Sequence, residues 1–311
     1  MSQEFLHPRL RSLLGSPPSP LSIAECSAAQ ARAWISARTA SRPPGPHVDE
    51  VRDLVAPSPH GGIPLRLYRP RSAQGVVVVF HGGGWLMGDI ASFDSTSRYL
   101  AVESGAAVVS VDYRLAPEHP FPAAIEDAWD ATQWVASQRG IIGVDTRTLA
   151  VLGESAGGNL AAVVCLMARD AGVPTISLQV LVYPPVDAAL TCPSLDQFAT
   201  GYLQSKRDVL HAYRTYGLGT VVSADDWRLS PLLAASHEGL PPSLIVSAEE
   251  DPIRDDSAAY HRRLLAAGVP AVHVRYAYMF HTFFGMRELV AEAELAQLQV
   301  AAAIRNSLAP R

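Results

Sequence analysis

The chain has 311 residues, of which 48% are hydrophobic, and carries a formal net charge of -5. A chain of this length can bury one large core, and its hydrophobic fraction is sufficient to fill it. The basic residues are scattered along the sequence, so neither a nucleic acid nor an anionic membrane surface is expected as a partner.

The first residues do not resemble a secretory signal, because Glu4, Pro8 and Arg9 interrupt them. The longest apolar runs, such as 160–168, are too short to span a bilayer. We therefore expect a soluble, cytoplasmic protein. The three cysteines, at positions 26, 165 and 192, are far apart and odd in number, which predicts neither a disulfide framework nor a zinc site.

The amino-terminal third begins with a helical arm and continues into strands. Residues 1–45 precede any strand pattern and are predicted to form this arm. The apolar runs Val51–Val55 and Ile63–Tyr68 are separated by prolines and glycines, which predicts an antiparallel pair of strands.

Six further short runs are rich in valine and isoleucine. They are Val76–Phe80, Ala106–Val111, Leu149–Leu152, Leu178–Val182, Leu244–Val246 and Val272–Tyr276. Helical spacing lies between most of them and is clearest in residues 122–138 and 257–267. Alternating strands and helices predict an α/β fold with a mainly parallel sheet of about eight strands, flanked by helices.

Residues 187–230 break this alternation. They contain helical patterns with tyrosine and valine on one side and follow a central strand. Together with residues 1–45 they are predicted to form a helical cap over a site on the core. The core itself is then expected in two parts, residues 46–186 and 231–311.

A serine between two glycines follows one of the predicted strands. The sequence Gly-Glu-Ser-Ala-Gly at 153–157 comes directly after the run 149–152 and opens a run with helical spacing. A sharp turn from strand to helix holds a nucleophile clear of the sheet, and flanking glycines leave room for such a turn. We therefore predict that Ser155 is a catalytic nucleophile.

A glycine run follows the strand Val76–Phe80. His81, three glycines and Trp85 occupy positions 81–85, so several backbone N–H groups there have no side chain beside them. Acyl transfer to a serine needs such donors for the developing oxyanion. Gly83 and Gly84, with Ala156 after the nucleophile, are predicted to supply them.

Four carboxylates compete for the acidic position after the strand Leu244–Val246. Asp251 is preferred because it lies just beyond the strand and is followed by a proline that stiffens the turn. Asp255 is predicted to cap the helix of residues 257–267. Glu249 and Glu250 are expected to support the site from behind or to face solvent.

Three histidines follow this acidic segment. His261 falls inside a helical run and His273 alternates within a strand, so both are expected to be structural. His281 lies beyond the last strand, in a loop before a helix predicted to start near Arg287. We predict His281 as the general base, and the order serine, aspartate, histidine is that of α/β hydrolases.

With these pieces in place, the chain resembles the hormone-sensitive-lipase family of carboxylesterases, the bacterial family IV. The matching segments are His81–Trp85, Asp112–Ala124, Gly153–Asn159, Ser230–Leu232 and Asp251–Asp255. The resemblance implies an α/β-hydrolase fold with a helical cap. It also implies hydrolysis of short to medium acyl-chain esters, with no cofactor and no metal.

The resemblance further implies that His81 and residues 114–117 hold the loop beneath the site. Two departures from the family pattern stand out. Glu154 occupies a position where aspartate is usual, and Phe280 and Thr282 flank the histidine where glycine is common. The second departure is expected to reshape the pocket.

Three aromatic residues adjoin predicted site elements and are candidates to line the pocket: Trp85, Tyr183 and Phe283. The same triad could cleave an amide or a formamide, so an amide hydrolase remains an alternative. The plant gibberellin receptors resemble the family without being catalytic, but they lack the histidine that His281 supplies here. Family resemblance also suggests a homodimer formed through the sheet edge.

Overall fold

The computed structural model describes residues 6–15 and 22–309. The first five residues and 16–21 of the predicted amino-terminal arm lie outside the described residues, as do 310 and 311.

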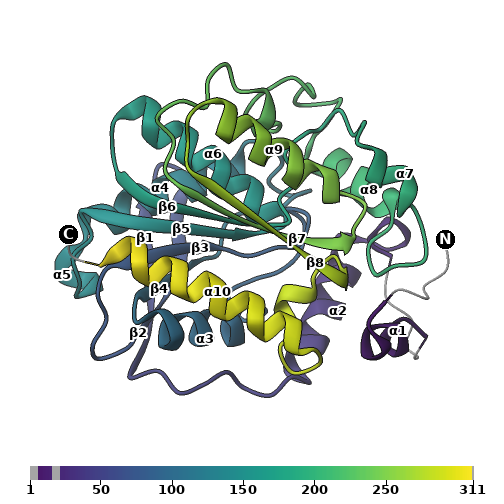
Figure 1. The fold of residues 1–311 in the computed structure, drawn as a ribbon. Coiled ribbons are helices and arrows are strands. Elements are labelled where there is room, and N and C mark those ends of the chain that lie inside the picture. The colour runs from purple at the N-terminus through teal and green to yellow at the C-terminus, as the bar shows by residue number, and fades with distance from the viewer. Residues whose placement is uncertain (1–5, 16–21, 310–311) are drawn as a thin grey trace.

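An eight-stranded sheet crosses the molecule in the order β1-β2-β4-β3-β5-β6-β7-β8 (Figure 1). Its strands are β1 (Glu50–Ser58), β2 (Gly61–Arg69), β3 (Val76–Phe80), β4 (Ala107–Val111), β5 (Thr148–Glu154), β6 (Thr175–Val182), β7 (Ser243–Glu250) and β8 (Ala271–Phe280). Only the β1–β2 and β2–β4 pairs are antiparallel. The predicted strands and the mainly parallel sheet are confirmed.

Helices cover both faces of the sheet (Figure 1). One face packs against α3 (Asp94–Ser104) and α10 (Ala291–Leu308). The other packs against α4 (Ala123–Ser137), α6 (Ala156–Ala171) and α9 (Arg254–Ala266), and the short α5 (Arg139–Ile142) follows α4. This double cover explains why the central strands are continuous apolar runs instead of alternating ones.

The valines of strand β3 contribute to the hydrophobic cores on both faces of the sheet. Val76, Val78 and Phe80 pack into the core below α4 and α6, whereas Val77 and Val79 pack into the core below α3 and α10. Successive side chains of a strand point to opposite faces, so a strand covered on both sides needs apolar residues throughout.

Two predicted helix boundaries are wrong. The helix α9 begins at Arg254 instead of position 257, and α10 begins at Ala291 instead of near Arg287. The chain between β8 and α10 is occupied by a short 3-10 turn, η4 (Phe283–Gly285). The spacing of apolar residues does not reveal such a turn, because three residues are too few to show a periodic pattern.

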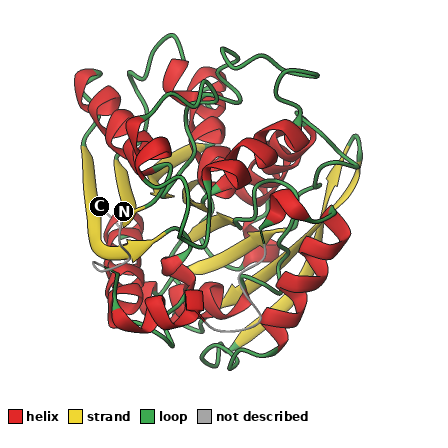
Figure 2. Cartoon of the chain, turned by 90° about the vertical axis from the view of Figure 1, so that its right-hand side faces the viewer, coloured by secondary structure: helices red, strands yellow, loops and turns green. Residues whose placement is uncertain are grey.

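The remaining helices gather on one side of the core, at the right of Figure 1 and toward the viewer in Figure 2. They are α1 (Pro8–Gly15), the 3-10 turn η2 (Ile23–Glu25), α2 (Ala28–Ala40), α7 (Pro193–Gln197) and α8 (Lys206–Tyr216), and the 3-10 turn η3 (Pro231–Leu233) leads back into the core. They come from the two segments predicted to form the cap.

A single carboxylate joins these two segments. Asp208 of α8 accepts hydrogen bonds from Ser22 Oγ at 2.6 Å and from the backbone N–H of Ala24 at 3.2 Å, both near η2. Its second oxygen accepts from the N-cap residue Ser205, at 2.6 Å. The same side chain therefore starts α8 and holds the amino-terminal segment against it.

The helix α2 is tied to the core by one arginine. Arg32 donates to the backbone oxygens of Leu86 at 2.9 Å and Ala116 at 2.8 Å, and it forms an ion pair with Glu118. All three guanidinium nitrogens of Arg32 therefore donate hydrogen bonds, either to the core backbone or to Glu118.

Candidate active site

Ser155 lies in the turn between β5 and α6, with φ 52° and ψ -119°. Residues other than glycine rarely adopt a positive φ, so the backbone at Ser155 is strained and must be held in place by its surroundings. One constraint is the hydrogen bond from the Ser155 N–H to the oxygen of Val182, at 2.8 Å.

The two glycines of the turn are required by space. A Cβ on Gly153 would overlap the backbone oxygen of Gly157, and a Cβ on Gly157 would overlap the backbone oxygen of Phe80. The turn is therefore packed directly against the end of β3, as the flanking glycines predicted.

Gly153→Ala is expected to destabilise the protein by about 3 kcal/mol or more, because the new methyl group has no room among backbone atoms that cannot move aside. Gly140→Ala is the matched control, since a Cβ there meets open space within α5. That control should leave the melting temperature unchanged or raise it. Equal melting temperatures for the two variants would contradict the packing argument.

The structure brings together the three predicted triad residues. His281 Nε2 lies 2.8 Å from Ser155 Oγ, and His281 Nδ1 lies 2.7 Å from Asp251 Oδ2. The other carboxylate oxygen of Asp251 accepts the backbone N–H of Ile253 at 2.9 Å. The carboxylate is fully buried, whereas Ser155 keeps 9% of its surface exposed and faces the cavity described below.

The aromatic residues Tyr183 and Phe283 lie behind this histidine. Both are fully buried, and neither lines the cavity, contrary to the expectation for pocket residues. The ring of Tyr183 is 4.5 Å from that of His281, and its hydroxyl donates to Glu154 at 2.6 Å. Burial raises the pKa of Tyr183 well above its usual value, so the hydroxyl remains a donor.

The glycine loop after β3 has a backbone that only glycine adopts easily. Gly83 has φ 124° and Gly84 has φ 61°, and a Cβ on Gly83 would overlap the backbone oxygen of Met87. Both glycines line the same cavity as Ser155 and Ala156. Within the described residues, the backbone N–H groups of Gly83, Gly84 and Ala156 donate to no other group.

Residues beneath the loop hold it in place. The imidazole of His81 stacks on Tyr113 at 4.3 Å, and the tyrosine hydroxyl donates to the His81 backbone oxygen at 2.7 Å. The Ala116 N–H donates to the Trp85 oxygen at 2.8 Å, and Arg114 forms an ion pair with Asp127. Burial lowers the pKa of His81, which therefore stays uncharged at neutral pH.

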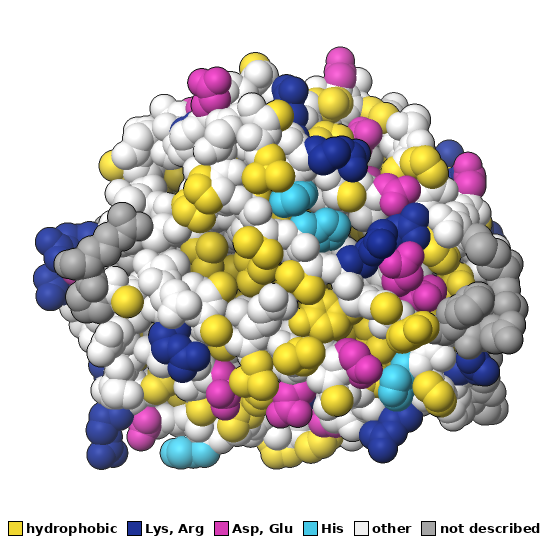
Figure 3. All heavy atoms as spheres, in the orientation of Figure 1, with side chains coloured by type: hydrophobic (Ala, Val, Ile, Leu, Met, Phe, Trp, Pro, Cys, Tyr) yellow, Lys and Arg dark blue, Asp and Glu magenta, His cyan; other side chains and the backbone are white. Residues whose placement is uncertain are grey.

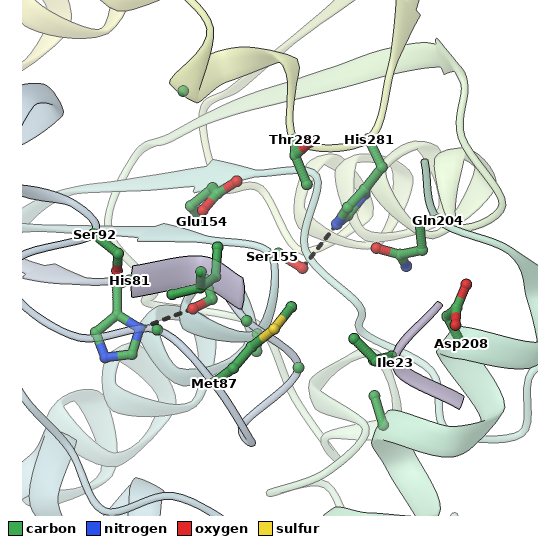
Figure 4. A pocket seen from close by; sticks show the side chains of 18 of the residues that line it. Ile23, His81, Met87, Ser92, Glu154, Ser155, Gln204, Asp208, His281 and Thr282 are labelled. Carbon is green, nitrogen blue, oxygen red and sulfur yellow. Dashed lines mark hydrogen bonds between the residues drawn. The ribbon is translucent and has the colours of Figure 1, made fainter. Parts of the chain in front are cut away.

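The cavity around Ser155 has a volume of about 170 Å³ and is lined by the core and by both of the segments predicted to form a cap. The residues of these two segments on its wall are Ile23, Trp34, Ile35, Arg38, Arg42, Leu203, Gln204, Asp208, Val209, Ala212 and Tyr213. Ser155 lies between two ends of this space in Figure 4, with Glu154 and Ser92 toward one end and Gln204 and Asp208 toward the other.

Trp85 is the one aromatic candidate that lines the cavity. Its ring also stacks on Tyr216 of α8 with centroids 4.7 Å apart. This residue therefore contributes both to the cavity wall and to the contact between the core and α8.

The acidic segment after β7 differs from prediction at one residue. Asp255 does not cap α9, because it lies inside the first turn, where its carboxylate accepts the N–H of Ser194 at 2.9 Å. Glu249 pairs with Arg254 and Arg275, and Glu250 is buried, where desolvation raises its pKa to about 7. Only Asp251 of the four carboxylates reaches the histidine of the site.

The other two histidines lie on α9 and β8, away from Ser155. His273 Nε2 is 2.7 Å from Ser247 Oγ, and its ring centroid is 5.7 Å from that of His261. Burial lowers the pKa of His273 to about 4. Neither lines the cavity.

Residues 6–15 and 22–309 contain neither a cluster of metal ligands nor a membrane-spanning helix. No group of three or more histidine, cysteine, aspartate or glutamate side chains there is arranged to hold a metal ion. No helix in this part of the chain is long and apolar enough to cross a membrane.

Sequence reasoning did not identify the polar residues that these two segments add to the cavity, chiefly Arg38, Arg42 and Gln204. A partial signal was present, because Trp34 and Arg38 are four residues apart and share a face of α2, whereas Arg42 lies beyond the end of that helix. Nothing in that spacing shows which way the face points.

Comparisons with known proteins agree with this geometry. A family described as the alpha/beta hydrolase fold matches residues 77–285. The carboxylic ester hydrolase LipN of Mycobacterium tuberculosis is 43% identical over 277 residues, covering 85% of this chain and 73% of that protein. The ethyl acetate hydrolase of Pseudomonas putida is 35% identical, with 84% of each chain covered.

A solved structure of a thermostable esterase from Pseudomonas putida ECU1011 matches with a TM-score of 0.92 at 34% identity, over 100% of both chains. The chain belongs to the alpha/beta hydrolase fold family. With the contacts that join Ser155, His281 and Asp251, it is a carboxylesterase of that family.

Proposed function

We propose that this carboxylesterase belongs to the hormone-sensitive-lipase family and hydrolyses esters with short to medium acyl chains through an acyl-enzyme. The observation that carries the proposal is the continuous contact from Asp251 through His281 to Ser155 at the wall of a small cavity. No cofactor takes part in the proposed reaction.

In the proposed mechanism, His281 Nε2 removes the proton of Ser155 as its Oγ attacks the ester carbonyl carbon. The resulting imidazolium is stabilised by Asp251 and then protonates the leaving alcohol as the ester C–O bond breaks. A water molecule activated by His281 then attacks the acyl-enzyme, the bond to Ser155 Oγ breaks, and the acid leaves.

The oxyanion is proposed to form against the backbone N–H groups of Gly83, Gly84 and Ala156. Their position beside Ser155 and their lack of partners among the described residues support this role. Donors that are already oriented need no rearrangement as negative charge develops, and each is typically worth about 3 to 4 kcal/mol in the transition state.

Residues 1–45 and 187–230 are proposed to act as a cap that limits acyl length. Side chains from both segments line the cavity, and Asp208 joins them. A cytoplasmic location stays a prediction from the sequence.

A series of p-nitrophenyl esters tests this proposal. We expect kcat/KM to be highest between the acetate and the hexanoate and lowest on the palmitate, because the cavity is small and the proposed cap segments form part of its wall. Matched acetate ester and acetanilide substrates test the amide alternative in the same assay. Faster turnover of the amide, or a maximum at the palmitate, would overturn the assignment.

A ligand-binding protein without activity would behave differently in a labelling experiment. A reactive organophosphonate should modify the wild-type protein at one equivalent, since Ser155 and His281 are in contact. Binding of esters without turnover or labelling would favour the non-catalytic alternative.

A homodimer through the edge strand β8 is also proposed. This strand ends the sheet, and Val272 and Tyr278 on it are 57% and 55% exposed. Hydrophobic side chains gather over β8 and α10 in the middle of Figure 3. Sedimentation equilibrium should give a dimer for the wild type and a monomer for Val272→Lys, because a lysine on an edge strand blocks pairing; a monomeric wild type would contradict this.

A further inference from the structure

Two arginines line the cavity that contains the reactive serine. Arg38 lies in the last turn of α2 and Arg42 lies just beyond the end of that helix, and both are half-buried at the cavity wall. A carboxylesterase acting on simple neutral esters has no need of cationic side chains there, so their presence calls for a reason.

Neither guanidinium forms an ion pair or a side-chain hydrogen bond with a described residue, although the carboxylate of Glu154 is close enough to Arg38 to attract it. Across residues 6–15 and 22–309, no carboxylate forms an ion pair with Arg38 or Arg42, and neither side chain donates a hydrogen bond. The nearest arginine on the same helix is different, since Arg32 is paired with Glu118 and bonded to two backbone oxygens. Partly buried guanidinium groups without acceptors are costly, so two at one cavity point to a ligand.

The cavity wall also carries two carboxylates, and both already have donors. Asp208 accepts from Ser22, Ala24 and Ser205, and it lies on the opposite side of Ser155 from Glu154 in Figure 4. Glu154 accepts the hydroxyl of Tyr183 and does not form an ion pair with either arginine. Two arginines therefore stand against one carboxylate, that of Glu154, which leaves a net positive charge near Arg38.

The two arginines also repel one another. Burial and the charge of Arg42 lower the pKa of Arg38 to about 10 and the charge of Glu154 opposes this shift only in part, so Arg38 stays positive at neutral pH. The planar ring of Trp34 lies 5.4 Å from the Arg38 guanidinium and supports it from one side. An anion placed between the two arginines would supply both hydrogen bonds and charge.

We propose that this carboxylesterase acts on esters that carry a free carboxylate, and that Arg38 and Arg42 bind that carboxylate while Ser155 attacks the ester carbonyl. The inference rests on the proposed function, since it names the substrate class of the same site. Guanidinium groups match a carboxylate in shape and charge, which makes a half-ester of a dicarboxylic acid a suitable substrate.

Two matched pairs of substrates test this proposal, because the carboxylate can belong to the acyl chain or to the alcohol. The first pair is monomethyl adipate and the methyl ester in which an isopropyl group replaces its carboxylate. The second is ω-acetoxyvalerate and the acetate in which isopropyl replaces the carboxylate. Hydrolysis is followed by pH-stat, and the readout is the ratio of kcat/KM for the charged ester to that for the neutral one.

We expect the wild type to prefer the charged member of at least one pair, which then identifies the side that faces the arginines. Arg38→Met and Arg42→Met should each lower that ratio on the order of 10- to 100-fold, the range typical of a lost hydrogen bond to a charged group. The lysine variants Arg38→Lys and Arg42→Lys should recover part of it. Arg214→Met, an exposed arginine of α8 outside the cavity, should leave the ratio at its wild-type value.

Inhibition gives a second readout that does not depend on turnover of charged esters. Adipate should compete with neutral-ester hydrolysis in the wild type and more weakly in Arg38→Met. A wild type that prefers the neutral ester in both pairs, or a ratio unaltered in both methionine variants, would overturn the inference and leave the esterase assignment intact. Failure to hydrolyse all four esters would instead contradict the proposed function.

Discussion

Ser155→Ala is expected to lower kcat for ester hydrolysis by a factor on the order of 10⁴ to 10⁶, the range seen when a serine nucleophile is removed from such a triad. The loss is this large because, in the part of the chain that the structure describes, no other hydroxyl forms a hydrogen bond with His281. Residual activity would come from the oxyanion donors and from binding alone. Initial rates on p-nitrophenyl butyrate and the loss of organophosphonate labelling measure the effect.

The fold should survive this substitution. Alanine meets the same positive φ as serine at this turn, and only one side-chain hydrogen bond is lost. Ser137→Ala, at the exposed end of α4, is the matched control and should retain full activity. If Ser155→Ala keeps wild-type turnover with an unchanged circular dichroism spectrum, a different nucleophile performs the reaction.

Asp251→Asn should be the next most damaging substitution, with kcat reduced on the order of 10⁴-fold. The reason is the orientation of the new amide. The N–H of Ile253 donates to Asp251 Oδ1, so the asparagine oxygen would stay at that position and its NH₂ group would face His281 Nδ1. His281 would then carry its proton on Nε2, where it cannot accept the proton of the serine.

Asp255→Asn provides the control for this argument, because Asp255 belongs to the same segment and its carboxylate bonds to the N–H of Ser194 instead of the triad. Its kcat should stay within a few-fold of the wild type. Stopped assays on the two purified variants decide the matter, and a larger loss in Asp255→Asn than in Asp251→Asn would exclude the proposed acid.

The parts of the fold that were predictable from sequence are those determined by residues close to one another in the chain. Strands such as β3 are continuous apolar runs because both of their faces are covered, and this composition is visible without a structure. The turn around Ser155 was equally visible, because its glycines are required by close backbone contacts. The order of serine, aspartate and histidine then limited the candidates for the triad.

The residues that could not be assigned depend on contacts between distant segments. Aspartate is a residue type that often caps helices, yet the carboxylate of Asp255 accepts a hydrogen bond from Ser194, which is far away in sequence. Tyr183 and Phe283 adjoin site residues in the chain, but their side chains turn into the core behind His281. Proximity in sequence says little about the direction of a side chain at the end of a strand.

The hydrogen bonds of Asp208 have a consequence for recombination between related enzymes. The wall opposite the serine is built from two stretches of chain that are separated by most of the core, and one carboxylate satisfies donors from both. A chimera that imports only the later stretch from a relative would pair that stretch with a foreign amino terminus. Transfer of substrate preference therefore requires that both stretches come from the same parent enzyme.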